Sequence, residues 1–388
     1  MKNRGFWLIA AAFFVTMLGT TLPTPLYPLY EKRFGFAPVV ITVIFATYAV
    51  GVIAGLVLFG HLSDRIGRRR ALLPGLAFSA LSAVAFLLAH GLPPILLGRL
   101  LSSLSAGMFT GAGTAALLDF VAENERSTAT LDAVAVNIGG LACGPLLAGL
   151  LSQYAGLKLR VPYAVDLVLL LPATFGVFAA PEMVDSADRK FRLPVQRLRI
   201  PPEMRDVFVR AAIAGVCGFA VAGLFSAVAP TLLGTVLHVT NRGIAGTLVF
   251  LFFAIGAAGQ VTVRHVSPRF GLALACALLT LGLVPLMVAI AAKSAVALFV
   301  AATIDGFAEG LAVGVGLAQI NERVAERRGE VISTYWVLLY VGLAVPVVGV
   351  GVVASFTGFP AAGYIFCAIV ATALLAVLAS LLGPEPKS

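Results

Sequence analysis

Charged side chains are scarce in this chain. Asp, Glu, Lys and Arg make up 12% of its 388 residues, whereas soluble domains carry about 25%. Hydrophobic residues make up 60%, and the mean hydropathy is +1.01. No soluble core could bury that much apolar surface. The composition therefore excludes a soluble globular domain and predicts that lipid surrounds most of the chain.

Cysteine and histidine are also rare, with four residues of each. The cysteines lie in separate apolar segments, which indicates small packing residues rather than disulfides. The histidines are scattered and show no metal-ligand spacing. A Walker sequence is absent, so ATP is not expected to drive the protein. We expect no metal and no cofactor. No Ser/His or Cys/His cluster can be placed at one depth of the membrane, which argues against an enzyme.

Long apolar runs, in contrast, fill the chain. A membrane-spanning helix needs about 20 mostly apolar residues, and twelve runs meet this requirement. They cover roughly residues 6–29, 39–60, 71–89, 93–118, 128–152, 161–179, 207–236, 243–262, 271–292, 294–318, 331–354 and 360–382. The first run follows basic residues as a signal peptide would, but it continues into three prolines without a cleavage site. The pattern predicts an all-α integral membrane protein.

The basic residues are unevenly placed between these runs. Of the 27 Lys and Arg, six lie in the loops that follow odd-numbered runs and one, Arg99, lies inside a run, which leaves 20 elsewhere. Those 20 lie at the two ends and in the loops that follow even-numbered runs. Because Lys and Arg accumulate on the cytoplasmic side, we expect both termini in the cytoplasm of a multi-pass protein of the cell's inner membrane. The net charge of +9 then reflects topology and does not indicate nucleic acid.

A polar segment divides the chain in two. Residues 182–206 are rich in arginine and proline and are too short for a domain, which indicates a cytoplasmic connector. It separates residues 1–181 from residues 207–388, with six runs in each half. The halves repeat weakly: at a shift of 204 residues, Ser63 to Gly67 falls on Ser267 to Gly271. Parallel repeats of this kind predict two pseudo-symmetric six-helix bundles with a substrate site between them.

A dense charged loop joins the second and third runs. Residues 60–70 read GHLSDRIGRRR. The loop resembles the one between helices 2 and 3 of the major facilitator superfamily, G-x-L-a-D-r-x-G-r-k. The resemblance implies a conformational latch between the two halves, with the first turn of the eleventh run, near Val331, as the partner. The implied latch residues are Gly60, Asp64, Arg65, Gly67, Arg68, Arg69 and Asp119. The alternative is that the loop only fixes topology.

The fifth run contains a stripe of small residues followed by proline. Gly140, Gly144 and Ala148 are four residues apart, which allows a neighbouring helix to approach closely. Gly144, Pro145 and Gly149 complete a segment that resembles the antiporter motif of the same family, G-x-x-x-G-P-x-x-G-G. The resemblance implies the drug:proton antiporter branch and a close contact of Gly144 with a helix of the other half. Ordinary helix packing is the alternative.

Charged residues inside the runs are the candidates for chemistry, because they are costly in a bilayer. Arg99 resembles the arginine of the family's helix-4 motif, although Ser102 and Ser103 replace its Gln and Gly; the alternative is an arginine that reaches the membrane surface. Asp305 and Glu309 are four residues apart in the tenth run, which places them on one helical face. Two nearby acids resist ionising together, so at least one is expected to keep its proton.

Proton coupling is therefore expected at Asp305, Glu309 and Arg99, with Asp305 preferred over Glu309 because it lies deeper. A buried structural acid is the alternative. The first run carries Gly19 where the family's drug exporters often have an acid, which also favours the tenth run. Asp132 and Asp166 lie nearer the ends of their runs and are expected to be interface residues or secondary proton sites.

The resemblance covers the whole chain and implies a twelve-helix secondary transporter with the major facilitator fold. We expect export of a small apolar or amphipathic compound in exchange for protons by alternating access. A proton-coupled uptake symporter for a sugar or organic acid is one alternative, and a non-transporting membrane sensor is another. The expected partners are a small-molecule substrate, protons and the lipid bilayer, with the protein as a monomer. Substrate, stoichiometry and resting conformation do not follow from the sequence.

Overall fold

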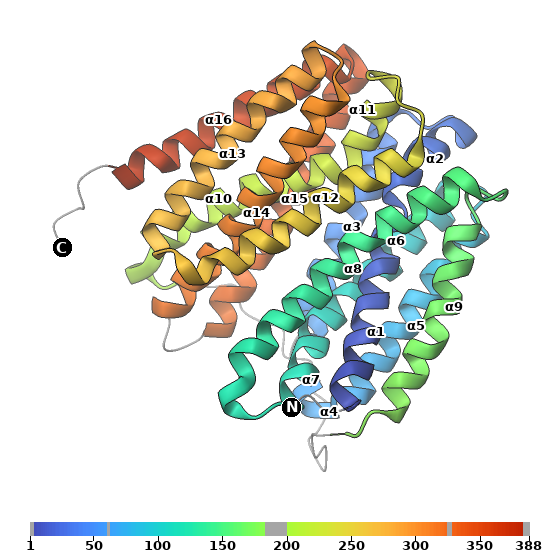
Figure 1. Cartoon of the computed structure of the whole chain (residues 1–388), viewed down its shortest axis with the longest axis vertical. Helices are drawn as coiled ribbons and strands as arrows, with labels where there is room; N and C mark the ends of the chain where they lie inside the picture. The colour runs from blue at the N-terminus through green and yellow to red at the C-terminus, as the bar shows by residue number, and fades with distance from the viewer. Residues whose placement is uncertain (1–3, 60–62, 183–199, 324–327, 383–388) are drawn as a thin grey trace. The chain divides into compact units, whose positions relative to one another are not determined.

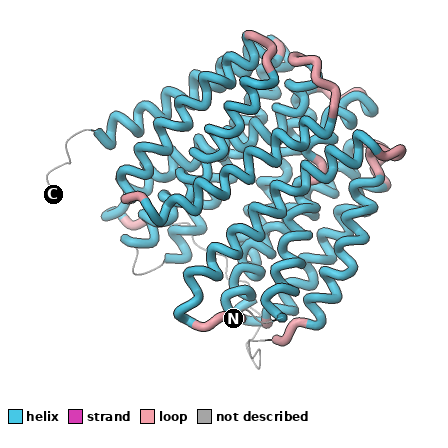
Figure 2. The backbone as a smooth tube through the Cα atoms, viewed as in Figure 1, coloured by secondary structure: helices cyan, strands magenta, loops and turns pink. Residues whose placement is uncertain are grey.

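The structure is a computed structural model that describes residues 4–59, 63–182, 200–323 and 328–382. These ranges are built of helices joined by short loops, and they contain no strand (Figure 1 and Figure 2). Twelve helical stretches within them are long and apolar enough to cross a membrane. The prediction of twelve spans is confirmed, because a bilayer requires each long apolar run to satisfy its backbone hydrogen bonds internally.

The first six spans use the following elements. They are α1 (Arg4–Thr21) continued by η1 (Thr24–Leu26) and α2 (Tyr27–Phe34); α3 (Pro38–Phe59); α5 (Arg68–Leu87); α6 (Leu92–Met108) continued by η2 (Phe109–Gly113) and α7 (Thr114–Asp119); α8 (Arg126–Tyr154); and α9 (Val161–Ala179). Short helices α4 (Ser63–Ile66) and η3 (Glu123–Glu125) lie in the loops.

The last six spans use the remaining long helices. They are η4 (Pro202–Met204) with α10 (Arg205–Gly223), η5 (Leu224–Val228) and α11 (Ala229–Thr235); α12 (Arg242–Thr262) with η6 (Val263–His265); α13 (Pro268–Ala291); α14 (Ala295–Arg323); α15 (Arg328–Thr357); and α16 (Phe359–Leu382). The elements η2 and η5 are π-helical turns, which take one residue more than an α-helical turn and are frequent at functional sites.

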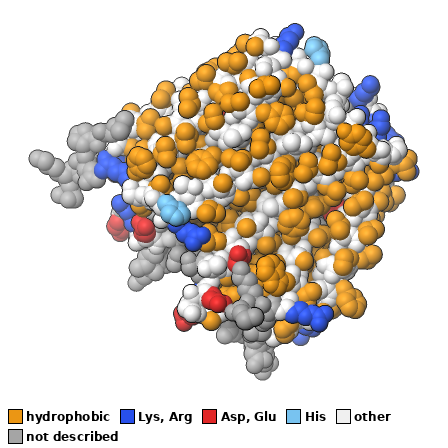
Figure 3. Space-filling view, in the orientation of Figure 1, with side chains coloured by type: hydrophobic (Ala, Val, Ile, Leu, Met, Phe, Trp, Pro, Cys, Tyr) orange, Lys and Arg blue, Asp and Glu red, His pale blue; other side chains and the backbone are white. Residues whose placement is uncertain are grey.

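The described residues form two compact units. Unit 1 contains residues 4–36, 43–182 and 241–250, and unit 2 contains residues 37–42, 200–240 and 251–382 with the gap at 324–327. The first turn of α3 thus clusters with unit 2, and the first half of α12 clusters with unit 1. On the face shown in Figure 3, hydrophobic side chains cover the helix bodies and charged side chains gather at helix ends, as lipid contact requires.

Glycines bring helix backbones into contact at matching places in the two units. In unit 1, a β-carbon at Gly55 of α3 would lie 3.0 Å from Cα of Gly107 in α6. In unit 2, a β-carbon at Gly310 of α14 would overlap the carbonyl of Gly256 in α12. Helices in lipid associate through such close packing, because burial of apolar surface gives little driving force there.

Loop chemistry explains where several helices begin and end. Gly35 follows α2 with φ 66° and Gly358 separates α15 from α16 with φ 83°, which is the backbone region that favours glycine. Asn241 caps α12, since its Oδ1 accepts the N–H of Gly243 at 2.8 Å. The break between the ninth and tenth runs falls at Lys293, which has φ 50°.

Candidate functional site

Two carboxyl groups lie inside unit 2, on the middle turns of α14. Asp305 is 0% exposed, and neither of its carboxyl oxygens has a hydrogen-bond partner. Glu309, one turn further along, is 8% exposed. Within the described residues neither carboxyl forms an ion pair. An unpaired carboxylate in a protein interior costs several kcal/mol, so both side chains are suited to hold a proton while they are enclosed.

The two carboxyls contact different helices, although their spacing predicts a common face. A β-carbon at Gly282 of α13 would overlap the Asp305 carboxyl, so Asp305 points at α13. Glu309 lies against α10 and α12, because β-carbons at Gly218 and Gly256 would lie 3.2 Å from its Cγ and 3.4 Å from its Oε2. Four residues turn a helix by about 40° more than one full turn, which is enough to direct neighbouring side chains to different helices.

A tyrosine adds a hydroxyl beside Glu309. Tyr335 of α15 is buried, and its hydroxyl has no hydrogen-bond partner. It lies against Gly215, one turn of α10 from Gly218, which faces Glu309. Two glycines leave room for this hydroxyl: β-carbons at Gly215 and Gly316 would meet it. No pattern in the sequence pointed to Tyr335, because its place near Glu309 depends on how α10, α14 and α15 pack.

Arg99 lies inside unit 1 and does not reach the membrane surface. Its side chain is 2% exposed, and Nη1 donates to the carbonyl of Thr20 at 2.8 Å. The guanidinium carbon lies 4.9 Å from the ring centre of Tyr48 and 5.8 Å from that of Phe45, so cation–π contacts also hold the charge. Nε is buried without a partner. The alternative of a surface-reaching arginine is wrong.

The two acids nearer to span ends differ in their surroundings. Asp166 of α9 is 2% exposed and lies against Gly19 of α1. Asp132 of α8 is half-buried and takes part in a contact. No group of three or more His, Cys, Asp or Glu side chains that could hold a metal ion occurs in the described part of the chain.

The charged loop forms a polar cluster at the start of α5. Arg68 Nε donates to Asp119 Oδ2 and its Nη1 donates to Ser63 Oγ, both at 2.7 Å. The carboxylate of Glu182 accepts the backbone N–H groups of Arg68 and Arg69 at 3.0 and 2.9 Å. Those N–H groups have no partner within the helix, and a negative charge complements the helix dipole there. The sequence singled out Asp119 but not Glu182.

Gly67 and Arg69 complete this cluster. Gly67 has φ 94°, a conformation that side-chain-bearing residues rarely adopt. Arg69 Nη2 donates to the carbonyl of Ala180 at 2.7 Å, which ties α5 to the end of α9. Gly60 lies outside the described residues. The backbone of Asp64 and Arg65 belongs to α4, but their side chains lie outside the part of the chain that the structure describes.

The small-residue stripe of α8 faces α1. A β-carbon at Gly140 would lie 2.5 Å from the carbonyl oxygen of Phe14, and one at Gly144 would overlap the carbonyl oxygen of Leu18. Thr21 Oγ1 donates to the carbonyl of Leu141 at 2.9 Å across the same seam. The expectation that Gly144 meets a helix of the other half is wrong, because α1 belongs to the same six-helix half.

The end of the motif turns toward the first half of α12. A β-carbon at Gly149 would lie 2.5 Å from the carbonyl oxygen of Arg242, and one at Gly246 would overlap the carbonyl oxygen of Pro145. Arg242 N donates to Gln153 Oε1 at 3.1 Å. Since the proline and the last glycine contact one helix and the earlier glycines another, the motif holds α8 against both neighbours.

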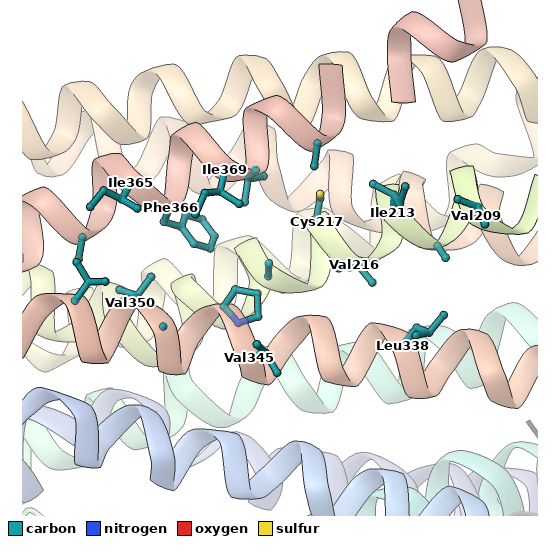
Figure 4. A pocket seen from close by; sticks show the side chains of 18 of the residues that line it. Val209, Ile213, Val216, Cys217, Leu338, Val345, Val350, Ile365, Phe366 and Ile369 are labelled. Atoms are coloured by element: carbon teal, nitrogen blue, oxygen red, sulfur yellow. The ribbon is translucent and has the colours of Figure 1, made fainter. Parts of the chain in front are cut away.

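Unit 2 contains a groove of about 620 Å³ between α10, α15 and α16 (Figure 4). Its labelled side chains come from all three helices. They are Val209, Ile213, Val216, Cys217, Leu338, Val345, Val350, Ile365, Phe366 and Ile369. The remaining lining residues are also apolar, and several rim residues are exposed, such as Val345 at 63% and Ile369 at 65%. A groove of this size and polarity suits a small apolar molecule.

Comparisons with known proteins agree with this architecture. A model of the Major Facilitator Superfamily matches residues 9–345. A crystal structure of a bacterial homologue of the human lysosomal transporter Spinster, in an inward-facing and unoccupied conformation, superposes with a TM-score of 0.71 at 15% identity and covers 97% of this chain and 93% of that one. At that identity the likeness shows the fold alone.

Curated relatives match over shorter stretches. The protein MdtD of Salmonella typhi, whose name assigns it provisionally to multidrug resistance, is 28% identical over 150 residues, which is 38% of this chain and 32% of MdtD. MdtD of Escherichia coli strain K12 is 25% identical over 174 residues, 43% of this chain and 37% of MdtD. The matches therefore span about a third of the length of these relatives.

Proposed function

Because the chain belongs to the major facilitator superfamily and is a multi-pass membrane transporter rather than an enzyme, we propose that it exports a small apolar or amphipathic compound in exchange for protons. The observation that carries the proposal is the pair of enclosed carboxyls on α14, Asp305 and Glu309, neither of which forms an ion pair among the described residues. Ionisable residues inside a membrane mark ion pathways and proton relays. A carboxyl that is neutral when enclosed and ionised when hydrated can carry one proton per cycle.

Within this pair, we propose Glu309 as the group that exchanges protons with water. Depth along the helix alone favoured Asp305. The contacts favour Glu309, because Asp305 lies against α13 at 0% exposure, whereas Glu309 is 8% exposed and faces α10 one turn from the Tyr335 hydroxyl. A proton needs a hydrated path at one stage of the cycle, and a side chain with no accessible surface offers the poorer one.

Two observations support export as the direction of transport. The segment from Gly140 to Gly149 has the spacing of the family's antiporter motif, and the partial relatives named MdtD carry a name that points to multidrug resistance. The excess of basic residues at both ends and in alternate loops supports cytoplasmic termini. With that topology, a proton would enter from outside and leave to the cytoplasm while the compound moves outward. We propose that a monomer is the working unit.

The apolar groove of unit 2 supports the substrate class. Its lining offers no charge or hydrogen-bond donor from a side chain other than the Cys217 thiol, so a sugar or organic acid would lose its water contacts there without replacement. A compound that partitions into the bilayer would lose none. We propose that apolar substrates occupy this groove on their way through the protein.

A larger side chain in the groove is expected to raise the KM for efflux of apolar compounds. Gly349 lines the groove, and a β-carbon there would meet nothing within 4 Å. Gly349→Leu should therefore fold normally and raise the KM for efflux of ethidium, a lipophilic cation, several-fold. Gly234→Leu on α11 is the matched control, because Gly234 also faces open space. Equal KM values for the two variants would show that the groove does not take part.

The proposed function is tested by expression in cells that lack their own efflux pumps. We expect raised resistance to lipophilic cations and neutral apolar drugs. In everted membrane vesicles, adding ethidium should collapse an imposed proton gradient. Resistance without proton movement would exclude the antiport. Proton-driven uptake of a sugar or organic acid into whole cells, with no resistance, would replace export by the symport alternative.

The charged loop is proposed as the conformational latch, with the first turn near Val331 as partner of Asp64. Asp64→Asn should leave the amount of inserted protein unchanged and slow efflux strongly, since a charge-assisted contact present in one state sets the balance between states. Asp119→Asn is the comparison, because it removes the ion pair with Arg68 inside unit 1. The latch role of Asp64 fails if Asp64→Asn transports at the parent rate at equal expression.

A further inference from the structure

Unit 1 holds an enclosed carboxyl of its own, on a helix that the proposed coupling site does not use. We propose that Asp166 of α9, seated over Gly19 of α1, is a second proton-binding site, so that each cycle carries a proton in unit 1 as well as in unit 2. The inference rests on the proposed proton antiport for its role in transport. Proton binding at Asp166 itself can be observed without any substrate.

Gly19 leaves space for the Asp166 carboxyl because it has no side chain. A β-carbon at Gly19 would lie 2.7 Å from Oδ2 and 2.9 Å from Oδ1 of Asp166. Both distances are shorter than van der Waals contact, so glycine is the residue that admits the carboxyl against the backbone of α1. Asp166 is 2% exposed, and its Oδ1 is buried without a hydrogen-bond partner. The carboxyl of α9 therefore occupies the place on α1 where a side chain of residue 19 would lie.

The groups around this seat are aromatic or hydroxylic. Tyr163, one turn before Asp166 on α9, accepts a hydrogen bond from the Tyr30 hydroxyl at 2.9 Å and stacks on Phe86 at 4.8 Å between ring centres. Tyr27 is buried and its hydroxyl has no partner. These three tyrosines keep their protons at neutral pH, since a phenol ionises near pH 10 in water. They offer no charge to balance an ionised Asp166.

In the described part of the structure, no charged residue of the neighbouring helices forms an ion pair with Asp166. Helix α9 packs against α1, α5 and α8. Arg4 of α1 and the arginines of α5 lie at the opposite ends of those helices from Gly19 and Phe86, and Asp132 lies more than two turns before the level of α8 that meets Thr21. Arg99 of α6 reaches the next residue of α1, but it donates to the carbonyl of Thr20 and forms no ion pair with Asp166.

An isolated carboxyl in such a place is stable as the neutral acid. Ionising it would place a charge that no ion pair balances in the described structure, among mostly apolar and aromatic groups and within one residue of the carbonyl that Arg99 binds. The proton can leave only when α9 and α1 separate enough to admit water, at which point the O–H bond breaks, the proton passes to water and the charge stays on the hydrated carboxylate. Proton binding at Asp166 is thereby coupled to the packing of α1, the helix that also carries the carbonyl held by Arg99.

The direct test is infrared spectroscopy of the purified full-length protein, which reports the C=O stretch of protonated carboxyl groups during a pH titration. We expect Asp166→Asn to remove one such band. The double variant Gly19→Asp/Asp166→Ala moves the carboxyl from α9 to α1 at the same place in the protein. It should restore a protonated-carboxyl band, because the surroundings of the carboxyl define the site and not the helix that carries it. Gly19→Ala keeps Asp166 but places a methyl group in contact with its carboxyl, so the C=O stretching frequency of that carboxyl should shift. Gly19→Ala serves as the second variant if Asp166→Asn does not fold.

The inference is overturned if Asp166→Asn leaves the protonated-carboxyl bands of the parent unchanged. It is also overturned if the band persists to alkaline pH in every variant and the number of protons exchanged per ethidium stays that of the parent, because Asp166 would then be a permanently neutral packing group. If the parent exchanges no protons, the proposed antiport fails, while the infrared titration still decides whether Asp166 binds one.

Discussion

Replacing both carboxyls of α14, in the variant Asp305→Asn/Glu309→Gln, is expected to abolish proton-driven efflux while substrate binding survives. The amides match the carboxyls in size and cannot lose a proton in the accessible pH range. Helix packing around Gly282 and Gly218 should therefore persist. Without a titrating group in unit 2, movement of the compound no longer requires movement of a proton through α14. Efflux against a concentration gradient should fall to the level of cells without the gene.

The single variants should separate the two acids. Glu309→Gln is expected to lose coupling nearly as fully as the double variant, because Glu309 is the more accessible group. Asp305→Asn should retain a substantial part of the efflux. The measurement is substrate-induced proton release from purified protein in weak buffer, together with downhill exchange of ethidium in proteoliposomes. Asp206→Asn, at an exposed acid in the first turn of α10, is the control for removal of a carboxyl.

The expectation is contradicted if the double variant releases as many protons as the parent. Coupling would then lie outside α14. Release reduced by half would instead leave one proton to unit 1, where Asp166 is enclosed. The ranking of the two acids is reversed if Asp305→Asn removes coupling and Glu309→Gln does not.

The second large effect is expected from a single methyl group on α8. Gly144→Ala places a β-carbon on the carbonyl oxygen of Leu18 and the hydroxyl of Thr21. The backbone of α1 cannot move aside without losing its own hydrogen bonds, so α8 must shift. Overpacking of this kind costs about 1–3 kcal/mol. We expect a lower unfolding temperature in detergent and reduced efflux.

Gly139→Ala is the control, because its β-carbon would lie 3.4 Å from the Phe14 ring, an ordinary contact. Both substitutions add the same atom to the same helix and raise helix propensity alike. The unfolding temperatures of the two variants should therefore differ through packing alone. If they coincide, the α1–α8 seam is looser than the structure describes.

Features set by local sequence could be predicted, whereas contacts between distant helices could not. Twelve apolar runs define twelve spans because length and hydropathy suffice for a bilayer. The acids of α14 stood out because a carboxyl inside an apolar run is conspicuous. Glu182 did not, since its acceptance of the Arg68 and Arg69 N–H groups depends on how α9 lies beside α5.

The same reason explains the error at Gly144 and the alternative that stayed open at Arg99. A stripe of small residues shows that a helix approaches closely, but it does not show which helix, and α1 is the neighbour that Gly144 meets. An arginine near a span end can turn outward or inward, and the carbonyl of Thr20 and two aromatic rings decide for the interior. Partner identity is a property of the packing, not of either segment alone.

The π-helical turn between α6 and α7, Phe109–Gly113, lets the span hold one residue more than a regular α-helix while its last turn keeps its direction. A π turn is what a helix contains after it has gained one residue, and each residue advances an α-helix by about 100°. Asp119 reaches Arg68 in this phase. Because a π turn accommodates its extra residue locally, deleting one residue within Phe109–Gly113 would regularise the span and leave Asp119 facing Arg68, whereas one residue deleted from a regular α-helical stretch would turn the rest of its span by about 100°.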